Sequence, residues 1–475
     1  QDRELQYDAR LPQSRRRWLH EGELASDYQL RRGLGERYEG GNGGEGDVDA
    51  LNRGEAIRSA NLNGNLGPFD LVSWDKGQRM VLSANEDYYL ADTDVGGGEF
   101  QGSPSLDSYT YQVFDERTTG YSAVKAGDIT SIGVEARKVS ELSDAEGVQV
   151  WSSKFGQGIF WLNLNFRANG WSQLRNREVR QALAHLLDKN TLIEQIKNGN
   201  ANPVDTFHPR WGPYYDDSEI TTFDASVEQA RQKLASGTSS DYGYDGQDQL
   251  IGPDGEQVEL TVVIENTSQE GEIVGNFLRQ RLESAGIAVS VEGNSFDRLL
   301  QTYLFNSVEN NPDYSGDPDY NAGRYNGGPP DQAVSREPWD ILSGVGFSMS
   351  PYAPWQPIEF TLTPQGPFNF TGYRADNYDI QGTVDEAPGA ESRERTQSMM
   401  TELFGFLSRE QPYVWAFNEH LTAAYRNGVE GLPEAENFFD GPSARLLSLS
   451  TARGGTPTPL ANESNGSGSD SGSGS

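Results

Sequence analysis

The sequence contains no cysteine, and it has no long run of apolar residues. Without cysteine the chain has no disulfide, no thiolate metal site, no iron–sulfur cluster and no cysteine nucleophile. No stretch of about 18 apolar residues occurs, so the sequence predicts no membrane-spanning helix. Residues 1–10 also lack the apolar stretch of a secretion signal. We therefore expect any signal or lipid anchor to lie outside this chain.

Basic residues are scarce, and lysine is rarer than arginine. The chain has 38 Lys+Arg, of which seven are lysine, against 71 Asp+Glu, which gives a formal net charge of -33. No basic patch interrupts the acidity, so we expect no nucleic-acid partner. A lysine-poor, acidic surface is typical of proteins that work in concentrated salt, where screening removes the repulsion between carboxylates. The composition therefore predicts a halophilic protein.

The motifs of common enzymes and cofactor sites are also missing. No phosphate-binding glycine loop and no dinucleotide fingerprint occurs, and the segment 346–350 lacks the second glycine of a nucleophile elbow. The histidines show no metal-binding spacing; they are His20, His185, His208 and His420. We predict no cofactor, no metal and no catalytic residues. An extracellular hydrolase using a pair of carboxylates stays open as an alternative.

Hydrophobic periodicity predicts an α/β protein. The clearest unit is a strand over 258–264, a helix over 270–284 and a strand over 287–291, which implies parallel pairing through a right-handed crossover. A helical pattern covers 179–187, and Asp188 is placed to cap a second helix over 191–196. Further strands are expected at 68–74, 79–82, 109–114, 341–347, 413–417 and 421–425, with a helix over 392–408.

Aromatic residues gather in two stretches that read as loops. The first is formed by Trp211, Tyr214 and Tyr215, and the second by Trp339, Phe347, Tyr352 and Trp355. Aromatic rings with a few polar groups are typical of clefts that hold a small organic ligand, because they give a large contact area at low entropic cost. Ordinary packing of the core or surface is the alternative interpretation.

Several ordered motifs resemble the family 5 extracellular solute-binding proteins, the peptide/nickel-type receptors of ABC importers. The match begins at Gly67-Pro68-Phe69 and continues through residues 121–129. Its strongest part is Asn163-Leu164-Asn165, Val179-Arg180-Gln181-Ala182-Leu183 and Leu187-Asp188-Lys189. Trp339-Asp340 and Pro412-Tyr413-Val414 extend it, so that the resemblance covers roughly residues 64–450.

This resemblance implies a two-lobe, periplasmic-binding-protein-like (type II) α/β fold with mixed sheets and a two-strand hinge. The expected organisation is a polar, Gly-rich N-terminal segment over 1–65, part of the first lobe over 66–165, the second lobe over 166–412, return strands over 413–455 and a Ser/Gly tail over 456–475. The family's first-lobe motifs that normally precede Gly67 are not found in 1–65, so we expect an incomplete first lobe.

The resemblance also implies a ligand site and partners. The family's "G-W-x-x-D" stretch corresponds to Gly346-Phe347-Ser348-Met349-Ser350, so that Ser350 stands where peptide receptors carry the aspartate for the ligand's ammonium group. The ligand-binding candidates are Phe347, Ser348, Ser350, Trp339, Trp355 and Asn369. The expected ligand is a small peptide or a similar organic solute; a nickel complex or an oligosaccharide stays open.

The implied protein is extracellular, lies at the cell surface and delivers its ligand to ABC permease subunits. We expect a monomer with only peripheral membrane association. A non-transporting surface or sensory protein on the same fold is a further alternative.

Overall fold

The computed structural model describes residues 67–92, 101–154, 156, 158–266, 269–346, 353–432 and 450–451. These residues divide into two compact units. The large unit is the continuous stretch 154–421, and the small unit combines 67–153 with 422–432 and 450–451. The predicted N-terminal segment 1–65 and the tail 456–475 lie outside the described residues. The predicted hinge remains a prediction.

The large unit is built on a mixed six-stranded sheet with the strand order β11-β10-β14-β6-β15-β7. Strands β11, β10 and β14 run parallel to one another, whereas the pairs β14–β6, β6–β15 and β15–β7 are antiparallel. The strands of this sheet are β6 (Ile159–Leu164), β7 (Ala201–Pro203), β10 (Glu259–Glu265), β11 (Ala288–Asn294), β14 (Ile341–Leu342) and β15 (Tyr413–Glu419).

The predicted strand–helix–strand unit is confirmed. β10 pairs in parallel with β11 from Glu259↔Ala288 onward, and α11 (Gln269–Ser284) connects them. Alternate residues of β10 face opposite sides of the sheet, and Val262, Val263 and Ile264 are all buried. A parallel strand that is covered on both faces explains the nearly continuous apolar run in this part of the sequence.

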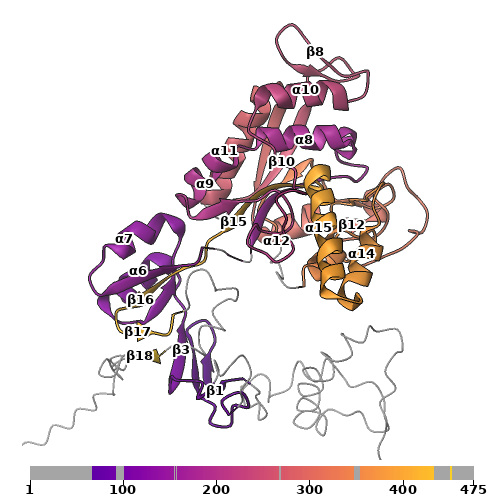
Figure 1. Ribbon diagram of the computed structural model, residues 1–475. Helices are drawn as coiled ribbons and strands as arrows, with labels where there is room; N and C mark the ends of the chain where they lie inside the picture. Colours follow the sequence, from indigo (N-terminus) through magenta and orange to yellow (C-terminus); the bar gives the residue numbers. More distant parts are fainter. Residues whose placement is uncertain are drawn as a thin grey trace, which may run out of the picture. The chain divides into compact units, whose positions relative to one another are not determined.

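Helices and a long irregular segment cover this sheet (Figure 1). α8 (Arg177–Leu186) and α9 (Lys189–Lys197) pack against β15, and α11 packs against β10. A second cluster, which includes Val263, Trp339 and Phe370, joins the sheet to the segment after β11. The remaining elements of the large unit are α10 (Val227–Gly237), β8 (Gly243–Tyr244), β9 (Leu250–Ile251), α12 (Phe296–Leu299), β12 (Asn306–Ser307), β13 (Val334–Ser335), α13 (Trp355–Leu362), α14 (Ile380–Glu386) and α15 (Arg393–Glu410).

Both helices predicted before residue 200 form, and each begins with a side-chain cap. The side chain of Asn176 accepts the N–H of Glu178 at the start of α8. Asp188 accepts the N–H of Thr191 at the start of α9, as predicted. Side-chain oxygens at these positions satisfy amide groups that have no partner inside the helix.

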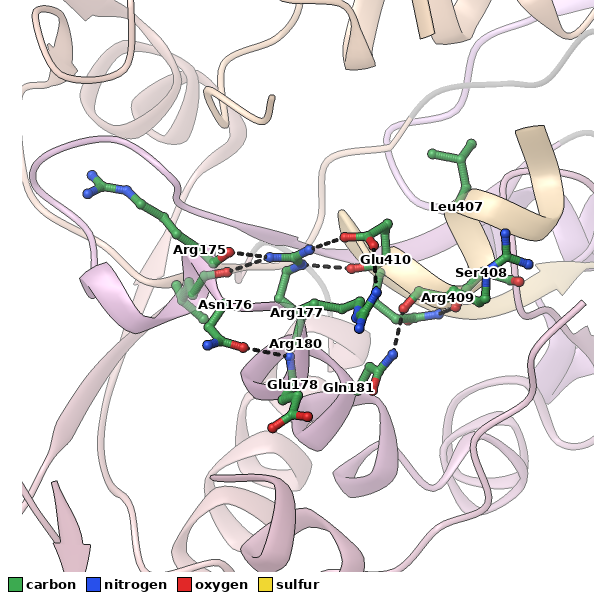
Figure 2. A network of polar contacts seen from close by, with 12 residues as sticks. Arg175, Asn176, Arg177, Glu178, Arg180, Gln181, Leu407, Ser408, Arg409 and Glu410 are labelled. Carbon is green, nitrogen blue, oxygen red and sulfur yellow. Dashed lines mark hydrogen bonds and ion pairs between the residues drawn. The ribbon is translucent and has the colours of Figure 1, made fainter. Parts of the chain in front are cut away.

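The arginine of the Val179-Arg180-Gln181-Ala182-Leu183 motif attaches α8 to the end of α15 (Figure 2). The Arg180 guanidinium donates to the backbone oxygen of Glu410 at 2.7 Å and to its carboxylate at 2.8 Å. It also donates to the backbone oxygens of Leu174 and Arg175. Neighbouring Gln181 donates to the backbone of Arg409 at 2.8 Å. This part of the motif is therefore structural.

Buried polar side chains hold the irregular segment between residues 305 and 373. Arg167 uses all five of its donors, toward the backbone oxygens of Gly328, Ala333, Asn369 and Phe370 and the side chain of Asn326. Asn306 and Asn326 donate to further carbonyls in the same way. Side chains here take the place of the backbone ladders that helices and strands provide.

The small unit contains two antiparallel three-stranded sheets, with the orders β1-β2-β3 and β4-β16-β5. A short hydrophobic core formed by Tyr121, Val124 and Leu142 lies beside the second sheet. The strands predicted at 68–74, 79–82, 109–114 and 421–425 all form. The elements are β1 (Phe69–Asp75), β2 (Arg79–Ala84), β3 (Ser108–Gln112), α6 (Arg117–Ala126), β4 (Ser131–Gly133), α7 (Val139–Ser143), β5 (Val148–Ser152), β16 (Thr422–Arg426), β17 (Val429–Glu430) and β18 (Ser450–Thr451).

One predicted strand is shorter than expected. The strand predicted over 341–347 consists of Ile341–Leu342 alone. Gly344 has a φ of 92°, a left-handed conformation that carries the chain out of the sheet. Across the described ranges, no helix combines the length and the apolar character that crossing a bilayer requires.

Candidate ligand cavity

The large unit contains a cavity of about 270 Å³ at one edge of its sheet. It lies where β10 and β14 reach their carboxyl ends, together with the start of β6 and the end of β15. Carboxyl ends of parallel strands are the usual position of ligand sites in α/β sheets. The lining residues are Gly158, Ile159, Phe160, Trp161, Ile196, Lys197, Glu265, Glu270, Gly271, Val274, Ser343, Gly344, Val345, Gly346, Phe417 and Glu419.

Two glycines allow the elements around the cavity to approach closely. A Cβ added at Gly271, in the first turn of α11, would stand 1.7 Å from the backbone oxygen of Glu265. A Cβ at Gly344 would stand 2.5 Å from the Cβ of Glu265. The first turn of α11 and the turn after β14 therefore both lie directly against the end of β10.

One polar wall of the cavity is a shared ion pair. The buried Lys197 ammonium, at the end of α9, lies 2.8 Å from a carboxylate oxygen of Glu270 and 2.9 Å from one of Glu419. Burial by itself lowers the pKa of Lys197, but Glu419 and Glu270 outweigh it, and the pKa is raised. Lys197 therefore stays charged. Glu265 adds a third carboxylate to the lining.

The lining also contains aromatic rings. The rings of Phe160 and Phe417 stack with centroids 4.8 Å apart and planes 6° from parallel. Trp161 stacks on Tyr413 at 5.1 Å and donates its indole N–H to the side chain of Asn163 at 2.9 Å. The cavity thus combines flat apolar surface with a few charged groups, which is the composition of a small-molecule site.

The arrangement agrees with a comparison of the sequence with protein families. The model of the bacterial extracellular solute-binding proteins, family 5 (middle part), matches residues 50–346. The chain belongs to this family. The resemblance stated from the motifs is confirmed, and so is the α/β fold class, because solved structures similar to this one are two-lobe periplasmic binding proteins.

Family 5 relatives with reported binding functions are distant in sequence. The oligopeptide-binding protein AppA of Bacillus subtilis (strain 168) is 21% identical over 377 residues, which cover 77% of this chain and 58% of that protein. The nickel-binding protein NikA of Staphylococcus aureus is 23% identical over 287 residues, covering 57% of this chain and 52% of the relative. The chain thus spans less than two thirds of the length of these relatives.

Solved structures of peptide- and nickel-binding proteins share the fold at similarly low identity. The oligopeptide-binding protein AppA from Bacillus subtilis in complex with a nonapeptide has a TM-score of 0.59 at 18% identity, over 86% of this chain and 70% of that one. NikZ from Campylobacter jejuni in complex with Ni(L-His) has a TM-score of 0.60 at 14% identity, over 84% and 70% of the two chains.

Of the predicted ligand residues that fall in the described ranges, which are Trp339, Trp355 and Asn369, none belongs to the cavity lining. Trp339 is 1% exposed and packs near Phe370. Asn369 is also 1% exposed, and its side chain bonds the backbone at Thr363, Gly372 and Tyr373. Phe347, Ser348 and Ser350 lie outside the described residues, directly after Gly346 in the sequence.

Trp355 is the one predicted ligand residue in the described range that stays partly exposed. It meets Tyr214 edge to face with ring centroids 6.4 Å apart. The two aromatic stretches recognised in the sequence are therefore in contact here, at a place separate from the cavity lining.

The cavity residues themselves were not singled out by the sequence. Lys197 and Glu419 come just after a predicted helix and a predicted strand. Charged residues are common at such positions in this acidic chain, so they did not indicate a ligand site. The usable signal was the end of β10, since Glu265 closes a buried parallel strand.

Proposed function

We propose that this protein is a solute-binding receptor of an ABC importer that captures a peptide or a similar small organic solute. The observation that carries the proposal is the cavity at the carboxyl ends of the sheet strands, whose lining combines stacked aromatic rings with charged side chains, in a chain of family 5. The peptide- and nickel-binding relatives support it. Delivery of the ligand to membrane permease subunits belongs to the same proposal.

The charges of the cavity favour a ligand with a positively charged group. Three carboxylates line it, from Glu265, Glu270 and Glu419, against the single ammonium of Lys197. A carboxylate in a partly apolar cavity is stabilised by an opposite charge. Ser350 replaces the aspartate that binds the ammonium group in peptide receptors of the family, and these glutamates would supply the missing negative charge.

The proposed site extends along the chain beyond the cavity. Phe347, Ser348 and Ser350 follow Gly346, the last described lining residue, and we retain them as ligand contacts. Trp355 is retained as an aromatic contact because its ring is partly exposed. Trp339 and Asn369 are retained only as supports, since both side chains are buried and Asn369 bonds its own backbone.

Filling the cavity should abolish binding. Gly158 belongs to the lining, and a Cβ at this position meets no atom within 4 Å, so Gly158→Phe adds a ring at the cavity with room for its first carbon. A tripeptide library is incubated with the protein, recovered by ultrafiltration and identified by mass spectrometry. We expect the variant to retain no more than about one tenth of the peptide that the wild type retains, because the phenylalanine ring occupies space that the ligand needs.

Gly243→Phe is the matched control, because a Cβ at Gly243 in β8 also meets no atom within 4 Å. It should retain peptide like the wild type. Equal retention by both variants would show that the ligand binds elsewhere, and an empty wild type would refute peptide binding. Mass spectrometry of compounds that copurify with the wild type then identifies any other ligand.

The acidic composition supports an extracellular protein that works in concentrated salt. With a formal net charge of -33, repulsion between carboxylates opposes the folded state unless ions screen it. We expect the melting temperature to fall steadily as NaCl is lowered from about 3 M to about 0.15 M, because the Debye length grows from under 3 Å to about 8 Å. Differential scanning fluorimetry measures this, and a melting temperature that rises or stays constant on dilution contradicts the halophilic assignment.

A further inference from the structure

Asn163 lies behind the cavity and is bonded to two parts of its wall. It is 1% exposed, belongs to β6 and is absent from the lining. Its side-chain oxygen accepts the indole N–H of Trp161 at 2.9 Å. Its amide nitrogen donates to the backbone oxygens of Leu342 at 3.2 Å and Val345 at 2.9 Å. One side chain thus connects the aromatic wall to the turn that follows β14.

The position of Asn163 in the sheet explains these contacts. Trp161 and Asn163 are two residues apart on one strand, so their side chains point to the same face. Asn163 is also directly opposite Leu342, because β6 pairs antiparallel with β14. β14 ends there, and Gly344 turns the chain away with a φ of 92°. The amide therefore bonds the carbonyl group of the last strand residue, Leu342, and that of Val345 in the turn beyond it.

The chemistry of the three bonds selects an amide side chain. One acceptor must meet an N–H, and two donors must meet carbonyl oxygens. Aspartate supplies the acceptor but neither donor, and alanine supplies none of the three. The side chain must also be short, because Asn163 is only 1% exposed and lies on β6 next to β14.

From these contacts we infer that Asn163 is a positioning residue for the ligand cavity. It sets the place of the Ser343–Gly346 turn relative to the Trp161 ring, and so the shape of the pocket that the ligand meets. It does this without touching the ligand. The inference rests on the proposed function only for its consequence on binding, because the coupling between the ring and the turn is a property of the unliganded protein.

Two measurements test the coupling without any ligand. The protein is labelled with 5-fluorotryptophan, and the fluorine resonance of Trp161 is assigned with Trp161→Phe. Asn163→Ala should shift or broaden this resonance and speed hydrogen–deuterium exchange of the 343–346 amides severalfold. Asn163→Asp should leave the resonance close to its wild-type position, because it keeps the acceptor, while exchange in the turn still accelerates.

Asn165→Ala is the matched control. Asn165 follows on the same face of the same chain segment, is 0% exposed, and donates to the backbone oxygen of Trp339 at 2.9 Å, away from the lining. It should lower the melting temperature about as much as Asn163→Ala, yet leave the Trp161 resonance and the exchange of 343–346 unchanged. If Asn163→Ala does not fold, Trp161→Phe is used in its place. This variant removes the hydrogen bond between Trp161 and Asn163 by deleting its donor, and it should accelerate exchange in the turn.

Binding completes the test with the tripeptide library as the probe. We expect Asn163→Ala to retain at least about tenfold less peptide, and Asn165→Ala to stay within twofold of the wild type. Equal losses in both variants, or an unmoved Trp161 resonance in Asn163→Ala, would overturn the inference. If the wild type retains no peptide, the proposed function fails, while the fluorine and exchange measurements still decide the role of Asn163.

Discussion

Replacing Arg167 by lysine should destabilise the large unit by about 3–5 kcal/mol. Arg167 is 1% exposed, and its five donors bond five oxygens at 2.7–3.0 Å. Burial lowers its pKa to about 10, still high enough to keep the guanidinium charged at neutral pH. A lysine has three donors, so at least two of these five oxygens lose the donor that the arginine supplies. Arg167→Met removes every donor and is expected to prevent folding.

Urea denaturation at constant salt measures the change in the free energy of unfolding. Arg177→Lys serves as the control, because the Arg177 side chain is 53% exposed and its ion pair with Glu410 is solvent-accessible on one side. We expect it to change stability by less than about 0.5 kcal/mol. If Arg167→Lys costs no more than the control, the carbonyl groups around Arg167 do not depend on it, and the irregular segment is held by other means.

The second large effect is a loss of stability in acid that depends on His208. Its ring is 0% exposed and stacks on Phe404 with centroids 4.7 Å apart, and neither ring nitrogen has a hydrogen-bond partner within the described ranges. Burial lowers the pKa of His208 to about 3, against about 6.5 when the chain is unfolded. The unfolded chain therefore binds the proton first. The stability is complete above pH 6.5 and declines as the pH falls toward 3, by up to about 1.4 kcal/mol per pH unit.

His208→Leu isolates this contribution, because the variant has no proton to bind at this position. The difference in unfolding free energy between wild type and variant should change with pH across that window and be constant above pH 7. A histidine ring carbon signal of His208 that stays in its neutral position from pH 7 to pH 4 gives independent support. Parallel pH profiles for the two proteins, or a titration of this signal near pH 6.5, would contradict the buried neutral ring.

The elements with regular periodicity could be predicted from the sequence. Three elements form within a few residues of the expected bounds: strand 258–264, helix 270–284 and strand 287–291. Each buries a fixed face, so its apolar residues recur in the sequence with the period of a helix or a strand. The cap at Asp188 follows from local chemistry in the same way. The strand predicted to reach Phe347 ends at Leu342, because Gly344 adopts a left-handed turn that apolar neighbours do not reveal.

The cavity could not be predicted because its lining comes from separate parts of the chain. Phe160, Lys197, Glu265 and Glu419 meet only when α9 and the ends of β6, β10 and β15 come together in the folded sheet. Asn369 shows the opposite difficulty. A polar residue near aromatic ones suggests a ligand contact, whereas its amide bonds the backbone of its own loop. Sequence alone does not distinguish a polar group that serves a ligand from one that serves the fold.

The large unit has a consequence for protein engineering. Among the described residues it is a single stretch of chain, 154–421, in which β6 is the first strand and β15 the last, and Ile159 and Asn418 are paired on these adjacent antiparallel strands. Its two ends are therefore neighbours in one sheet, the arrangement that tolerates circular permutation and domain insertion. Residues 154–421 can be regarded as a cassette, exchangeable between host chains or joined end to end by a short linker.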